Sequence, residues 1–171
     1  MTRIEVTKKI DFSIKLMSET LSQFSSEPFF TRKNDKWSPA EQAQHLVLSI
    51  KPLQLAYRLP GFALRLLFGK MNRPTRTYEE LLDKYHAKLE TGATASAAYV
   101  PKQLKTGTTS EGVIVSLQIA HQKVEKWKES DLDKYVLPHP LLGKISLREM
   151  LYFTDFHILH HNTLTKTIYL S

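Results

Sequence analysis

Apolar residues recur at spacings of three and four along four long stretches of the chain, the pattern of a helix with one buried face. The stretches cover residues 4–25, 39–57, 109–129 and 147–168. We find no convincing strand between them, so the pattern predicts an all-α protein. The first three apolar faces consist of Ile10, Ile14, Met17, Leu21 and Phe24; Ala43, Leu46, Val47, Ile50 and Leu53; and Val113, Leu117, Ala120, Val124 and Trp127.

Two of these predicted helices begin with a capping signal. Ser38 is a good N-cap residue, Pro39 fits the first helical position, and Glu41 completes a capping box. Ser146 and Glu149 repeat the box at the start of the last stretch. These signals place two helix starts to within a residue.

The segments between the stretches predict how the helices connect. Residues 59–108 form a long crossover that includes a short helix at 78–89, and residues 62–76 and 131–144 are predicted to be irregular. Such a crossover lets the helices before and after it run parallel. The sequence therefore predicts a single domain over residues 1–171, built as a four-helix bundle.

Composition and charge exclude several classes of protein. The chain has no Cys, which excludes a thiolate metal site and a Cys nucleophile. The net charge of +7 comes from scattered Lys and Arg, so we expect no nucleic-acid partner. The densest basic stretch, from Arg65 to Arg76, is predicted to be a solvated loop. Residues 1–12 are charged and lack the apolar core of a signal peptide, and no apolar run is long enough to span a bilayer, so we expect a cytoplasmic protein without a membrane partner.

The last predicted helix places two histidines in its apolar stripe. His157 and His161 lie one turn apart at the centre of the stripe, and His160 lies at its edge. The pair can be two core histidines with hydrogen-bond partners, or two ligands of one metal ion. The zinc-protease motif is excluded because Ile158 stands where that motif has Glu. The stripe consists of Met150, Phe153, His157, His161, Leu164 and Ile168.

The remaining histidines give weaker indications. His45 lies beside the stripe of the second helix, where a structural role is favoured, although the pair lacks a third ligand. His121, next to the stripe of the third helix, is interpreted as structural. His86 and His139 are expected to be exposed. Further expectations are that Tyr152 and Asp155 lie on the surface and that Trp37 and Trp127 pack in the core or at a helix cap.

Two segments resemble the DinB-like superfamily, and most closely its bacillithiol-transferase-like subgroup. The first is Trp-Ser-Pro-Ala-Glu-Gln-Ala-Gln-His-Leu at residues 37–46, and the second is His-Pro-Leu-Leu-Gly-Lys-Ile-Ser-Leu at residues 139–147, followed by the pair at 157 and 161. The resemblance implies an up-down-down-up bundle and a divalent metal, zinc or nickel, held by His45, His157 and His161. Three imidazole ligands leave a coordination position open, as in catalytic sites.

The resemblance also implies a function. Relatives include S-transferases that use a low-molecular-weight thiol such as bacillithiol, mycothiol or glutathione. We therefore expect a metal-dependent thiol S-transferase, or a related hydrolase, with a small-molecule substrate. His160 and His121 are weak candidates for a catalytic acid or base. The alternatives are a bundle that binds a small ligand without chemistry and a dimerising bundle, and relatives suggest a homodimer. The sequence does not identify the metal, the thiol or the electrophile.

Overall fold

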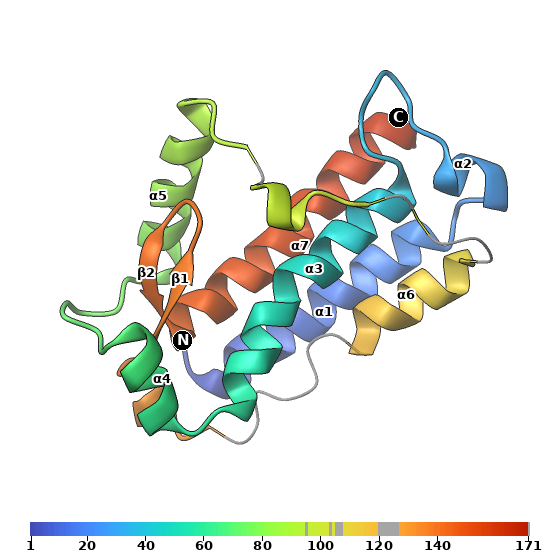
Figure 1. Cartoon of the computed structure of the whole chain (residues 1–171). Coiled ribbons are helices and arrows are strands. Elements are labelled where there is room, and N and C mark those ends of the chain that lie inside the picture. The colour runs from blue at the N-terminus through green and yellow to red at the C-terminus, as the bar shows by residue number, and fades with distance from the viewer. Residues whose placement is uncertain (95, 103, 105–107, 120–126, 171) are drawn as a thin grey trace.

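The computed structural model describes residues 1–94, 96–102, 104, 108–119 and 127–170. This part of the chain is mostly helical, with seven α-helices and one small two-stranded sheet (Figure 1). The elements are α1 (Arg3–Leu21), α2 (Ser26–Phe30), α3 (Pro39–Arg58), α4 (Gly61–Phe68), α5 (Tyr78–Glu90), η1 (Ala97–Tyr99), α6 (Ser110–Ile119), η3 (Glu129–Asp131), β1 (Val136–His139), β2 (Gly143–Ser146) and α7 (Leu147–Tyr169).

Four of the helices, α1, α3, α6 and α7, pack side by side (Figure 1). Helices α1 and α7 run parallel: Ser13 meets Asp155 in the middle of both helices, and Phe24, just past the end of α1, packs against Tyr169 at the end of α7. Helix α3 runs antiparallel to α7, because the carbonyl of Trp37, just before α3, accepts a hydrogen bond from Tyr169. Buried apolar side chains from all four helices form the core between them.

Helix α7 is the central element, since it also contacts α5 and both strands. Every residue from Leu147 to Asp155 is buried. The expectation that Tyr152 and Asp155 lie on the surface is therefore wrong. Asp155 accepts hydrogen bonds from Ser13 and Tyr78, which lie on α1 and α5. A stripe on a helical wheel assumes that the opposite face meets water, and α7 has no such face over this length.

Both predicted capping boxes are confirmed. Ser38 accepts a hydrogen bond from the backbone N–H of Glu41, whose carboxylate accepts from the N–H of Ser38. Ser146 and Glu149 make the same reciprocal pair at the start of α7. Because each box satisfies N–H groups that have no partner within the helix, the starts of α3 and α7 are fixed locally.

The segment 131–144, predicted to be irregular, contains most of a β-hairpin, so the expectation of no strand is wrong, whereas the mostly helical character is confirmed for the described residues. Strand β1 pairs antiparallel with β2, and Val136 lies opposite Ser146. Gly143 adopts a φ of +75°, a conformation that glycine reaches without strain. Four-residue strands are too short to show a periodicity, and Pro138 argues against a strand.

Other predicted boundaries change in the structure. Helix α1 ends at Leu21 rather than Ser25, a short helix α2 follows from Ser26, and α4 occupies part of the segment 62–76, which is predicted to be irregular. The third predicted helix is confirmed over Ser110–Ile119, but residues 129–131 form a 3-10 turn, so it does not reach Glu129 as an α-helix. Residues 120–126, including His121, lie outside the described residues.

The start of α7 holds a buried carboxylate, Glu149, whose side chain is 0% exposed. Arg73 donates to both of its oxygens at 2.8 and 2.9 Å, and Arg76 donates through its backbone N–H at 2.9 Å and its guanidinium at 3.3 Å. The prediction that the basic stretch is wholly a solvated loop is therefore wrong at these two arginines, which join the crossover to α7.

No helix among the described residues is both long enough and apolar enough to cross a membrane.

Candidate metal centre

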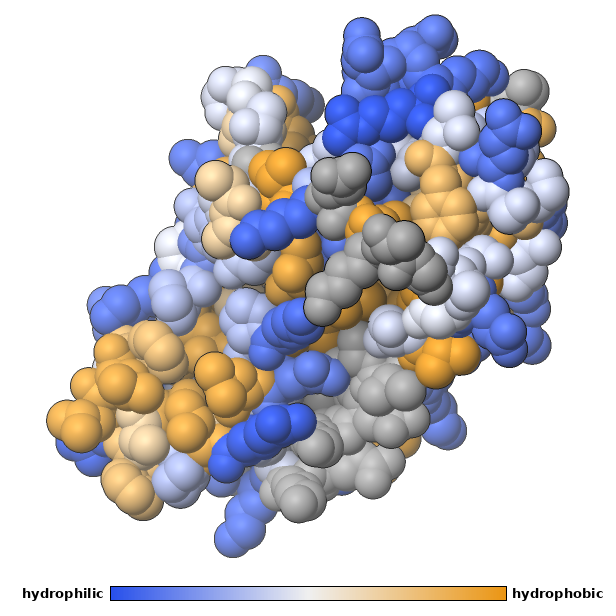
Figure 2. All heavy atoms as spheres, turned by 45° about the vertical axis from the view of Figure 1, so that its right-hand side comes forward, coloured by the Kyte–Doolittle hydropathy of each residue, from blue (hydrophilic) through white to orange (hydrophobic). Residues whose placement is uncertain are grey.

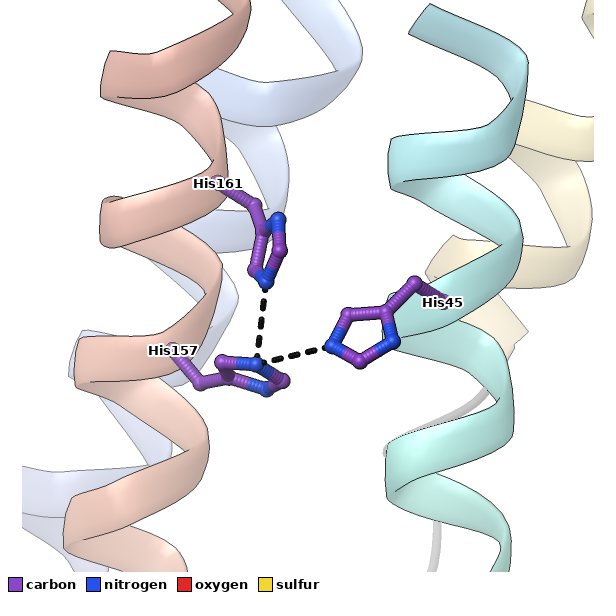
Figure 3. Close-up of side chains that lie close together, drawn as sticks. All are labelled: His45, His157 and His161. Atoms are coloured by element: carbon purple, nitrogen blue, oxygen red, sulfur yellow. Dashed lines mark hydrogen bonds between the residues drawn. The ribbon is translucent and has the colours of Figure 1, made fainter. Parts of the chain in front are cut away.

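Three buried histidines from two helices converge on one point (Figure 3). His45 comes from α3, and His157 and His161 come from α7. The Nε2 atom of His157 lies 3.1 Å from Nε2 of His45 and 3.0 Å from Nε2 of His161. One nitrogen from each ring lies within 4.8 Å of the other two. The structure thus brings together the three residues that the resemblance implies as ligands.

Local and tertiary structure together position these side chains. The capping box at Ser146 sets the start of α7, and a spacing of four residues then directs His157 and His161 to the same face. Helix α3 packs antiparallel along that face, which brings His45 to the same level although it lies 112 residues from His157. The pairing is therefore a product of helix packing rather than of sequence proximity.

The outer nitrogens of two rings are held by oxygen acceptors. The Nδ1–H of His45 donates to the backbone carbonyl of Tyr99 at 2.7 Å, and the Nδ1–H of His161 donates to Oε1 of Gln42 at 2.5 Å. A carbonyl oxygen can only accept, so both rings carry their proton on Nδ1. Their Nε2 atoms then present lone pairs toward the centre, as in metal sites where a second hydrogen bond orients the ligand.

This arrangement fits a cation better than hydrogen bonding among the rings. If the proton of His157 is on Nε2, it can form a good hydrogen bond to Nε2 of either His45 or His161, and the lone pair of the remaining ring has no donor. If the proton of His157 is on Nδ1, the lone pairs of all three Nε2 atoms face one another. A single metal ion at the centre satisfies all three Nε2 atoms at once. The three-histidine group can therefore hold a metal ion.

The electrostatic environment keeps the rings neutral. Burial, followed by the neighbouring imidazoles, lowers the pKa of His157 and His161 well below the ordinary value of 6.5. Burial also lowers the pKa of His45, and its hydrogen bond to Tyr99 opposes only part of that effect. Neutral imidazole is the form that binds metals, so the site needs no deprotonation at neutral pH.

The spacing of the nitrogens agrees with ordinary metal–nitrogen bonds. Bonds of about 2.1 Å place two ligand nitrogens about 3.4 Å apart at a tetrahedral angle and about 3.0 Å apart at a right angle. The two measured separations, 3.0 and 3.1 Å, lie at the lower end of this range. One ion of the size of zinc or nickel can bond His157 and either neighbour without moving the helices.

Aromatic rings enclose the cluster. The ring of Phe153 stacks on His157 with centroids 4.8 Å apart, and Trp37 lies 5.0 Å from the ring of His45 and stacks on His161 at 6.4 Å. These rings exclude water from the backs of the imidazoles. Trp37 thus packs beside the cluster, and Trp127 is buried and donates its indole N–H to the carbonyl of Tyr57.

The other three described histidines do not join the cluster. His160 is half-buried, and its ring centroid lies 5.3 Å from that of His161. His86 is exposed, as predicted. His139 was predicted to be exposed but is half-buried: it packs 4.3 Å from the ring of Phe153, and burial lowers its pKa to about 4. The hairpin turn accounts for this, because Leu141 and Leu142 donate their N–H groups to His139.

Sequence reasoning missed the groups that orient the ligands. Gln42 lies three residues before His45 on α3, so its helical spacing could have indicated a place on the same face. The carbonyl of Tyr99 carries no sequence signal, because any residue supplies a carbonyl.

Comparisons of the chain with protein-family models, with curated proteins and with solved structures found no match.

Proposed function

We propose that this chain is a metal-dependent enzyme of the DinB-like superfamily, with α1, α3, α6 and α7 as an up-down-down-up four-helix bundle. The parallel direction of α1 and α7 and the antiparallel direction of α3 support this topology. The two segments that carry the resemblance lie at the start of α3 and in the hairpin that leads into α7. The observation that carries the proposal is the convergence of three Nε2 atoms, with the rings of His45 and His161 oriented by hydrogen bonds at their outer nitrogens.

The proposed reaction joins a low-molecular-weight thiol to an electrophilic small molecule: the thiol gives its proton to a base, its sulfur forms a bond to the electrophilic carbon, and the leaving group departs from that carbon with the bonding electron pair. A divalent zinc or nickel ion supplies Lewis acidity and favours the thiolate form of the cosubstrate. The chain has no Cys, so its nucleophile has to come from that cosubstrate. His45, His157 and His161 hold the ion, and Gln42 and Tyr99 fix two of the rings.

The thiol has to lose a proton when its sulfur attacks the electrophile. His160 is half-buried next to His161, and burial lowers its pKa, so it is neutral at pH 7 and able to accept a proton. We propose His160 as the candidate acid or base. A cytoplasmic location, a homodimeric state and a single domain over residues 1–171 stay predictions.

Metal content tests the site first. Protein purified without a His tag or chelator should contain about one equivalent of a transition metal by elemental mass spectrometry. His45→Ala should lose that metal because it removes one of three ligands, whereas His86→Ala, which changes an exposed histidine, should retain it. Absence of metal after incubation with zinc and nickel, or retention in His45→Ala, would contradict the three-histidine site.

Turnover tests the enzyme. Metal-loaded protein should consume a thiol and an electrophile together, and His45→Ala should not. A panel of bacillithiol, mycothiol and glutathione with an alkylating electrophile gives the first screen. Metal binding without turnover on this panel would favour the alternative, a bundle that binds a small ligand without chemistry.

A further inference from the structure

Helix α4 exposes an unusually apolar surface. Phe62 is 75% exposed, Leu66 84% and Leu67 61%, and Leu55 near the end of α3 is 61% exposed. We call these four residues the α4 patch. Figure 2 shows hydrophobic side chains gathered at one end of the molecule, with hydrophilic side chains beside them. Exposed apolar side chains grouped in this way usually mark an interaction site.

The exposure does not come from a loosely attached helix. Leu64, on the face of α4 opposite Phe62 and Leu66, is completely buried. Gly61 lies so close to the ring of Tyr135 that a side chain there would clash, and Lys144 donates to the carbonyl of Phe68 at the end of the helix. Helix α4 is therefore anchored at both ends and at its centre, and it holds the α4 patch outward.

The chain segment that carries the α4 patch has charges of a single sign. No Asp or Glu occurs between Glu41 and Glu79, whereas six basic residues do. Two of these, Arg73 and Arg76, pair with Glu149. The other four make no ion pair with any described residue, and each is exposed. They are Lys51, Arg58, Arg65 and Lys70.

The basic and apolar side chains share the same helix faces. Lys51, Leu55 and Arg58 recur at spacings of four and three on α3, and on the wheel of α4 Arg65 lies beside Phe62, on the side away from Leu66. A surface of aromatic and aliphatic side chains with Arg and Lys at its border matches the boundary between lipid headgroups and acyl chains. There the apolar groups enter the acyl region and the cations meet phosphates.

We propose that the α4 patch docks this protein on the surface of an anionic phospholipid bilayer. A second copy of the chain is the poorer occupant, because a symmetric contact would bring together four basic side chains of each copy that pair with no described residue, with no acidic side chain from this segment between them. The proposal departs from the expectation of no membrane partner, which rested on the lack of a spanning segment. It is independent of the metal centre.

Vesicle flotation tests the proposal with the full chain. Vesicles of phosphatidylcholine with about one-third phosphatidylglycerol should carry the protein upward at low salt, and pure phosphatidylcholine vesicles should not. The double variant Phe62→Ser/Leu66→Ser should bind anionic vesicles at least about tenfold more weakly, because each side chain contributes about that much when buried. Circular dichroism should show an unchanged fold, since both side chains are exposed.

Matched variants separate the contributions. Phe12→Ser changes a phenylalanine of α1 that is 60% exposed and should bind vesicles like the wild type. Arg58→Gln/Arg65→Gln should weaken binding to anionic vesicles without changing the fold. The proposal would be overturned by no flotation with anionic vesicles, or by equal flotation with pure phosphatidylcholine vesicles. It would also be overturned if the protein is a dimer in solution, Phe62→Ser/Leu66→Ser makes it a monomer, and neither form binds vesicles.

Discussion

Replacing Glu149 by Gln should destabilise the protein far more than the same change in the other confirmed capping box. Glu149 is completely buried and accepts hydrogen bonds from Arg73, Arg76 and the N–H of Ser146. Gln keeps the size of the side chain but loses the charge and turns an amide N–H₂ toward guanidinium donors. The variant leaves two arginines partly buried without their counterion.

The exposed fractions of the two arginines determine how much stability Glu149→Gln is expected to lose. Removing one partner of a buried ion pair costs about 3–5 kcal/mol. Arg73 and Arg76 are 27% and 23% exposed, so water recovers part of the loss and we expect about 3 kcal/mol. In a chain of this size that lowers Tm by about 6–12 °C. Glu41→Gln is the control, because its partner Arg32 is 51% exposed, and we expect about 1 kcal/mol or less.

Urea unfolding followed by circular dichroism measures both variants, and pH adds a second test. Burial raises the pKa of Glu149, but the hydrogen bonds from Arg73, Arg76 and Ser146 outweigh it, so the pKa falls below its ordinary value of 4.5. The carboxylate therefore adds stability above pH 4.5, and the protein loses it as pH falls through the lowered pKa. The difference between wild type and Glu149→Gln should shrink as the pH falls below that range.

Equal destabilisation by Glu149→Gln and Glu41→Gln at neutral pH would refute this reasoning. It would mean that the buried ion pairs add nothing to the capping hydrogen bonds that the two sites share.

Two further predictions concern the metal centre. Gln42→Ala should weaken metal binding about 10–100-fold in a calorimetric titration, because His161 loses the acceptor that orients it, while Gln44→Ala on the same helix should change it little. When free metal is held near 100 times its Kd, removing it with a chelator should lower the Tm of the wild type by about 5–11 °C. The His45→Ala variant should show no such shift. An unchanged Tm of the wild type would contradict a site that joins α3 to α7.

The correct predictions from the sequence concern local features, namely helix starts and the direction of side chains within one helix. The starts of α3 and α7 follow from capping boxes contained within four residues, and a spacing of four directs His157 and His161 to one face of a helix. These features need no knowledge of what packs against the helix. The apolar stripes of α1 and α3 are confirmed for the same reason, since Ile14 and Leu46 are buried where their spacing places them.

What the sequence did not predict depends on packing between distant segments. Taken alone, His45 favoured a structural role, and only the resemblance to a family indicated that it belongs with the pair on α7. The partnership of Arg73 with Glu149 joins residues 76 positions apart, and the burial of Asp155 depends on Ser13, 142 positions away. No periodicity within one helix carries such information.

The 112 positions between His45 and His157 also constrain when the proposed metal site can first bind an ion. When α3 has emerged from the ribosome but α7 has not, the chain offers only His45 of the three proposed ligands. A metal ion therefore binds weakly at this stage. Capture has to wait until α7 has been synthesised and has settled against α1 and α3. Metal acquisition would then be a late event in biogenesis, and a cell short of the metal should accumulate a folded but empty protein rather than a stalled folding intermediate.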